Sequence, residues 1–155
     1  MKSKRGQKGF TLVELLIVIV ILGILAALVV PRMLAQANQA NTAEAANMLG
    51  TIRRSTINFG DATGAAFPAF STSASMAAGS GWAQIGLGAL PATRKFDYAT
   101  PGGAQGANVT VTATRRGAGA DAGNTMTINL DTGALGCGGY TPITDANGAV
   151  VRCQA

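Results

Sequence analysis

One glutamate and two cysteines carry most of the chemistry that this 155-residue chain offers. Glu14 is the one charged residue in an apolar stretch, Leu12–Val30. A carboxylate inside a membrane helix costs about 2.5–3.5 kcal/mol on insertion scales, so a sequence that keeps one usually provides a cation for it. Cys137 and Cys153 can pair as a disulfide if this part of the chain is exported, whereas in the cytosol they would be two free thiols.

Catalysis and metal binding find little support in the composition. The chain has no histidine, which removes the commonest general base and the usual neutral metal ligand. Two cysteines are too few for a cysteine-rich zinc site. Because no nucleophile–base pair or metal cluster can be assembled from these residues, we expect no enzyme activity, no cofactor and no metal.

The basic charge is concentrated at the N-terminus. The net charge is +5, from 12 basic and 7 acidic residues. Four basic residues precede residue 10: Lys2, Lys4, Arg5 and Lys8. Without them the balance is nearly neutral, so the basicity orients a membrane segment by the positive-inside rule. Nucleic-acid binding by the pairs Arg94-Lys95 and Arg115-Arg116 is a weaker alternative, since short pairs are more often solvated surface charge.

The N-terminal half predicts one long helix in two parts. Leu12–Val30 has 19 residues, and at 1.5 Å per residue it spans roughly 28 Å, close to a hydrocarbon core of about 30 Å. Pro31 predicts a kink near Val30. Residues 32–59 then resume as an amphipathic helix that Gly60 ends, with its apolar face formed by Ala45, Met48, Ile52 and Phe59.

The C-terminal half predicts a small sheet. Residues 61–106 are loop-like, with a short helical turn near 82–90. Apolar and polar residues alternate over 109–114 and 125–130, which predicts an antiparallel hairpin, and 149–152 predicts a last short strand. We therefore expect an α+β fold: a long N-terminal helix, its first half membrane-spanning, packed against a small C-terminal antiparallel sheet.

The string Lys8-Gly9-Phe10-Thr11-Leu12-Val13-Glu14-Leu15-Leu16 resembles the leader junction of type IV pilins and type II secretion pseudopilins. In that family a prepilin peptidase cuts after the glycine and methylates the new amino terminus. The resemblance implies cleavage between Gly9 and Phe10, leaving N-methyl-Phe10. It also implies a pilin-like domain plan: a leader at 1–9, a transmembrane and assembly helix at 10–31, and a periplasmic or extracellular domain at 32–155 that includes the second half of the helix.

The resemblance assigns roles to single residues as well. Glu14 would neutralise the amine of a neighbouring subunit's Phe10 and set the register of assembly; the alternative is a carboxylate that snorkels at the membrane interface. Gly23 and Pro31 would let the helix loosen in the fibre, although Gly23 also suits close helix packing. Type IV pilins commonly carry a C-terminal loop closed by a disulfide, here Cys137–Cys153, which major pseudopilins usually lack.

Three functions stay open from the sequence. The first is a structural subunit of a type IV pilus in adhesion, motility or DNA uptake. Such a subunit forms a helical homo-oligomer, works with prepilin peptidase and the pilus assembly machinery, and moves from the inner membrane to an extracellular pilus. The second is a pseudopilin of a type II secretion system. The third is an exported protein with an ordinary signal peptide, because Ala35-Gln36-Ala37 matches a cleavage pattern.

Overall fold

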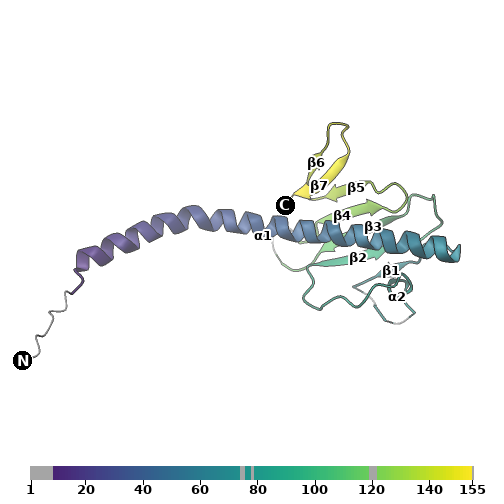
Figure 1. Ribbon diagram of the computed structural model, residues 1–155, viewed down its shortest axis with the longest axis horizontal. Coiled ribbons are helices and arrows are strands. Elements are labelled where there is room, and N and C mark those ends of the chain that lie inside the picture. Colours follow the sequence, from purple (N-terminus) through teal and green to yellow (C-terminus); the bar gives the residue numbers. More distant parts are fainter. Residues whose placement is uncertain (1–8, 74–75, 78, 119–121, 155) are drawn as a thin grey trace, which may run out of the picture. The chain divides into compact units, whose positions relative to one another are not determined.

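The computed structural model describes residues 9–73, 76–77, 79–118 and 122–154 (Figure 1). It divides into two compact units, residues 1–37 and Asn38–Ala155. One helix, α1 (Leu12–Thr63), contributes to both units. The expected class, α+β with an N-terminal apolar helix and a C-terminal antiparallel sheet, is confirmed.

Helix α1 ends later than the sequence suggested. Gly60, the predicted terminator, is a buried residue inside the helix, and the last helical residue is Thr63. Gly64 ends the helix instead: its φ is 64°, and its N–H donates to the carbonyl of Gly60 at 2.8 Å. A glycine adopts this left-handed conformation without the steric cost of a Cβ. The sequence offers two glycines four positions apart, Gly60 and Gly64, and its pattern does not show which of them adopts the positive φ that ends the helix.

The second part of α1 lies across one face of the sheet (Figure 1). The residues it buries completely are Ala45, Leu49, Ile52 and Thr56. The sequence placed Met48 and Phe59 on this face, but both are only half-buried and pack at its margin. Thr56 is tolerated in the core because its hydroxyl donates to the carbonyl of Ile52 at 2.8 Å, which satisfies the buried polar group.

The main sheet has five antiparallel strands in the order β1-β2-β3-β4-β5. The strands are β1 (Phe70–Ser71), β2 (Phe96–Thr100), β3 (Thr110–Arg115), β4 (Thr125–Asn129) and β5 (Leu135–Gly138). Strands β3 and β4 are the hairpin that alternation predicted, with Val111 opposite Ile128 and Ala113 opposite Met126 on the buried face. Trp82, Phe96, Tyr98 and Leu130 are among the other side chains of this core. Burial raises the pKa of the Tyr98 hydroxyl.

Three strands of this sheet, β1, β2 and β5, were not predicted from the sequence. The predicted loop over 61–106 contains β1 and β2. The short helical turn expected near 82–90 is present as α2 (Gly81–Gln84), which begins one residue earlier and is shorter, and Ser80 caps it through Ala83 N–H. The signal for β2 was the alternation of Phe96 and Tyr98, both buried, with Asp97 and Ala99. Strand β5 was not recognised because it contains two glycines, Gly136 and Gly138. Both are needed there, since a Cβ at either position would collide with the hydroxyl of Thr127 or Thr125 on β4.

A separate two-stranded sheet pairs β6 (Thr141–Thr144) with β7 (Val150–Gln154). The turn between them is held by Asp145, whose Oδ1 accepts from the N–H groups of Asn147 and Ala149, both at 2.9 Å. Such a turn is an ordinary use of aspartate. Within the described residues, no group of three or more histidine, cysteine, aspartate or glutamate residues is placed to hold a metal ion. The predicted strand over 149–152 is β7, although its partner β6 was not foreseen.

Candidate functional site

The N-terminal end of α1 is closed by a reciprocal pair of hydrogen bonds. The Thr11 hydroxyl accepts from the Glu14 N–H at 3.3 Å, and Glu14 Oε2 accepts from the Thr11 N–H at 3.0 Å. The Thr11 hydroxyl also donates to the same carboxylate oxygen at 2.9 Å. This arrangement is a capping box, which satisfies backbone donors that a helix start leaves without partners. Gly9 and Phe10 precede it in non-helical conformation.

Sequence reasoning treated Glu14 as an unpaired carboxylate and did not identify Thr11 as a functional residue. The signal was present, because Thr-x-x-Glu before an apolar run is the pattern of a capping box. In the single chain the carboxylate therefore has a local partner. Both hydrogen bonds from Thr11 end on Oε2 and bring no positive charge, so they engage one oxygen without neutralising the carboxylate.

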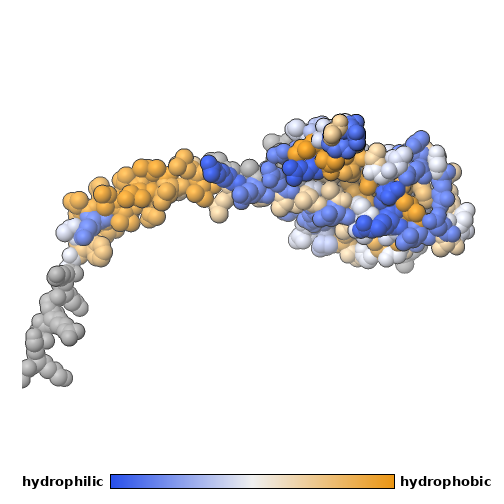
Figure 2. Space-filling view, turned by 45° about the horizontal axis from the view of Figure 1, so that its top comes forward, coloured by the Kyte–Doolittle hydropathy of each residue, from blue (hydrophilic) through white to orange (hydrophobic). Residues whose placement is uncertain are grey.

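No described part of the single chain packs against the apolar segment Leu12–Val30. All of its residues are exposed in the single chain, and it is long and apolar enough to cross a membrane. On the face drawn in Figure 2 it presents a continuous hydrophobic surface. A surface of this kind has to be covered by lipid or by other helices.

Gly23 and Pro31, the predicted points of helix weakness, both lie inside α1. The helix is assigned without a break across both positions. A Cβ added at Gly23 would meet no atom within 4 Å, so no neighbour in the single chain requires a glycine there. Their proposed role, in a fibre or between membrane helices, stays a prediction about the assembled state.

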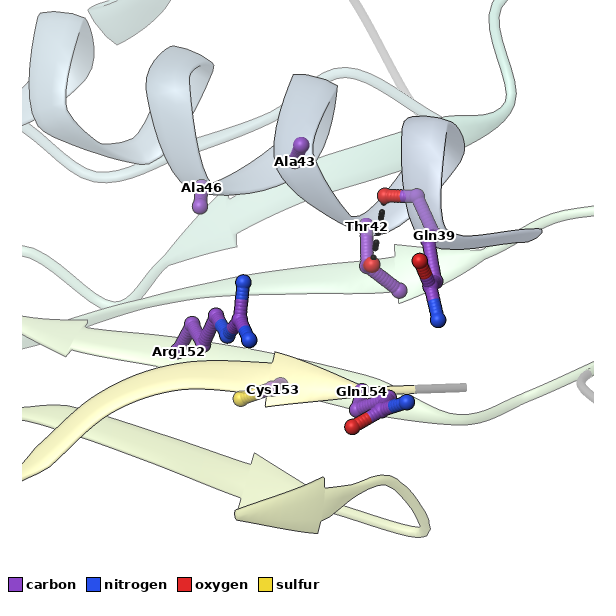
Figure 3. A pocket seen from close by; sticks show the side chains of 7 residues that line it. All are labelled: Gln39, Thr42, Ala43, Ala46, Arg152, Cys153 and Gln154. Carbon is purple, nitrogen blue, oxygen red and sulfur yellow. Dashed lines mark hydrogen bonds between the residues drawn. The ribbon is translucent and has the colours of Figure 1, made fainter. Parts of the chain in front are cut away.

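Cys137 on β5 and Cys153 on β7 form a disulfide, with their Cα atoms 5.7 Å apart. The bond joins the five-stranded sheet to the two-stranded one. A small pocket of about 100 Å³ lies beside it, between α1 and β7 (Figure 3). Its lining residues are Gln39, Thr42, Ala43, Ala46, Arg152, Cys153 and Gln154.

The comparisons with known proteins agree on the N-terminal segment. The family described as the prokaryotic N-terminal methylation motif matches residues 4–30. Type II secretion system core protein G of Pseudomonas aeruginosa is 58% identical over 38 residues, 24% of this chain and 27% of that protein. The type IV wide pilus major component PilA4 of Thermus thermophilus is 60% identical over 37 residues, 24% of this chain and 28% of that protein.

Core protein G of Vibrio cholerae is 51% identical over 45 residues, 29% of this chain and 31% of that protein. The matches to these relatives thus span less than a third of each protein's length. No solved structure matches the chain. Residues 4–30 carry the N-terminal methylation motif that type IV pilins and type II secretion pseudopilins share. The similarity to these proteins therefore covers the N-terminal segment, which in this chain precedes a domain with an antiparallel sheet.

Proposed function

We propose that this chain is a structural subunit of a type IV pilus, cleaved after Gly9 and assembled through its N-terminal helix. The observation that carries the proposal is the leader junction joined to a fully exposed apolar segment, Leu12–Val30. A helix that is apolar on all sides suits a membrane first and a bundle of identical helices afterwards. The subunit would leave the inner membrane for an extracellular fibre, and the protein would act by assembly rather than by catalysis.

Glu14 supplies the specificity of assembly in this proposal. Cleavage at Gly9 creates an amine at Phe10, and a neighbour's Glu14 carboxylate would neutralise it inside an apolar bundle. The capping box is compatible with this role, because Thr11 holds the carboxylate at the helix start and leaves one oxygen for a second partner. Adhesion, motility and DNA uptake are all functions that such a fibre could serve.

A pseudopilin of a type II secretion system is the second candidate. The names of the relatives from P. aeruginosa and V. cholerae favour it. The matched region discriminates poorly, however, because a pilus component shares it at 60% identity. The C-terminal disulfide favours the pilus, since it closes the kind of loop that the resemblance associates with pilins. Fibres recovered by shearing cells would support a pilus; subunit confined to the envelope and required for release of secreted proteins would support a pseudopilus.

The test of the proposal is the mature N-terminus. Intact mass measurement should find a chain that begins at Phe10 with one added methyl group. Gly9→Val should leave the precursor in the membrane, because the peptidase would no longer find the small residue at the junction. Gly6→Val is the matched control, three residues upstream in the same leader, and should be processed normally. An uncleaved wild-type chain, or one that starts at Asn38, would refute the proposal.

A further inference from the structure

Two pairs of basic residues, 21 positions apart in sequence, meet at one end of the neighbouring strands β2 and β3. Phe96 at the start of β2 pairs with Arg115 at the end of β3. The register therefore brings Arg94 and Lys95 beside Arg115 and Arg116, and the N–H of Arg116 donates to the carbonyl of Lys95 at 2.8 Å. We call these four residues the basic edge. The sequence showed two separate pairs, and only the strand register makes them one cluster.

The four positive charges of the basic edge are paired with one carboxylate, that of Asp97, among the described residues. Arg94 Nη2 lies 2.8 Å from Asp97 Oδ1 and Arg116 Nε lies 3.2 Å from Oδ2. Counting Asp121 as well, which lies outside the described residues, residues 94–121 contain two more basic than acidic residues. The basic edge thus carries a net positive charge that the fold does not neutralise.

The arginines of the basic edge are held in place by the fold. Arg94 Nη2 donates to the Thr72 carbonyl at 2.9 Å, and Arg116 Nη1 donates to the Ala92 carbonyl at 3.2 Å. The Arg115 guanidinium lies over the Phe96 ring, 5.4 Å from its centre, and its buried Nη1 has no acceptor within the part of the chain that the structure describes. These side chains lose less conformational freedom on binding than free surface arginines would.

The surroundings of the basic edge decide which anionic partner it fits. The aromatic residues nearest to it, Phe96 and Tyr98, are buried, so they cannot stack on unpaired bases. The one large hydrophobic side chain exposed in the described part of the second unit is Val151, on β7, so the basic edge lacks an apolar anchor for a bilayer or an amphipathic peptide. Guanidinium groups match phosphate oxygens in geometry as well as in charge.

We propose that the basic edge binds the phosphate backbone of double-stranded nucleic acid without sequence preference. This site is separate from the N-terminal helix and does not depend on filament assembly, so it can be measured on a monomer. Each phosphate contact contributes about −0.9 to the slope of log K against log salt. For three contacts, the affinity should fall about 40-fold between 50 and 200 mM salt.

The experiment measures binding of a 30-base-pair DNA duplex to residues 10–155 in a non-ionic detergent, so that the leader cations do not contribute. The variant is Lys95→Gln with Arg116→Gln. The control is Arg54→Gln with Arg152→Gln, which removes the same charge from α1 and β7, where Arg54 has a single bond of 3.4 Å to the Thr51 hydroxyl. The variant should bind about tenfold more weakly than wild type, and its affinity should fall only about 3–4-fold over the same salt range. The control should stay within about twofold of wild type.

Three outcomes would overturn the proposal. Equal losses in the variant and the control would mean that only net charge matters. Tighter binding to heparin than to the duplex would assign the basic edge to another anionic partner. A salt slope unchanged in the variant would place the phosphate contacts elsewhere. Fluorescence of Trp82, the one tryptophan and a buried one, checks that both variants are folded. None of these outcomes affects the processing test of the proposed function.

Discussion

Glu14 has two candidate partners, and they belong to different states of the protein. In the single chain it closes a capping box with Thr11. In a fibre it would pair with the amine of a neighbour's Phe10. A capping box stabilises the start of a helix, whereas a buried ion pair fixes the position of one subunit against another. The two roles need different properties of the side chain: a hydrogen-bond acceptor in the first case and a negative charge in the second.

Three substitutions separate these roles. Glu14→Gln keeps an acceptor for the Thr11 N–H but removes the charge, Thr11→Val keeps the charge but removes the hydroxyl of the cap, and Glu14→Ala removes both. We expect Glu14→Gln and Glu14→Ala to lower the yield of sheared filaments by at least about tenfold, because losing one member of a buried pair costs about 3–5 kcal/mol. Thr11→Val should lose about 1 kcal/mol of helix stability and assemble within about twofold of wild type.

The measurement compares sheared fibres with membrane-bound mature subunit in the same cells. Leader cleavage should be normal in all three variants, because each substitution makes the helix more hydrophobic and so does not impair insertion. If Glu14→Gln assembles normally while Thr11→Val and Glu14→Ala fail, the carboxylate acts as a helix cap and the assembly mechanism is wrong.

At the scale of elements, the sequence predicted what periodicity and hydropathy encode. The long helix, the hairpin of β3 and β4 and a strand near 150 were all visible as patterns. Strand β5 was not, because it contains Gly136 and Gly138, and glycine is rare in strands for reasons of entropy. Those glycines are explained only by the hydroxyls of Thr127 and Thr125 across the strand pair. The basic edge could not be predicted from the sequence either, because its two pairs of residues come together only through the register of β2 with β3.

Arg53 connects α1 with the end of β4, a role that its sequence position near a helix end did not reveal. Its Nε donates to the Leu130 carbonyl at 2.9 Å and its Nη2 to the Asp131 carbonyl at 3.1 Å. The Asp131 carboxylate in turn accepts from the N–H groups of Gly106 and Asn108, at 2.8 and 2.9 Å. One arginine and one aspartate thus fix the turn after β4 to the helix and to the loop before β3.

Replacing this arginine tests the connection. Arg53→Gln should lower the free energy of unfolding by about 2–3 kcal/mol, because two hydrogen bonds from a charged donor are lost and two carbonyls lose their partner. Arg54→Gln is the neighbouring control on the exposed side of the same helix and should change stability by less than about 0.5 kcal/mol. Urea unfolding of the chain in detergent, followed by Trp82 fluorescence, gives both values. Equal effects would show that the Arg53 bonds do not stabilise the fold.

The whole molecule combines an exposed apolar helix with a domain whose core is small. Among the described residues, the hydrophobic core lies in the second unit, Asn38–Ala155. Small domains bury too little apolar surface to be very stable and are often cross-linked. Here the cross-link joins β5 to β7, so the β6–β7 hairpin is tied to the main sheet by a covalent bond as well as by packing. An exported domain can keep such a bond, because its environment is oxidising.

Removing the disulfide should therefore weaken the C-terminal part most. The bond connects residues 16 positions apart, and closing a loop of that size stabilises the fold by about 3 kcal/mol in the chain-entropy model. We expect Cys137→Ser with Cys153→Ser to lower the unfolding free energy by about 2–4 kcal/mol. Hydrogen exchange should rise first in β6 and β7, since β1–β4 keep their backbone pairing. Wild-type protein treated with a reductant is the control and should match the double variant. Unchanged exchange in β6 and β7 in both samples would mean that packing alone holds the hairpin, and detection of free thiols in protein recovered from the cell surface would contradict the cross-link itself.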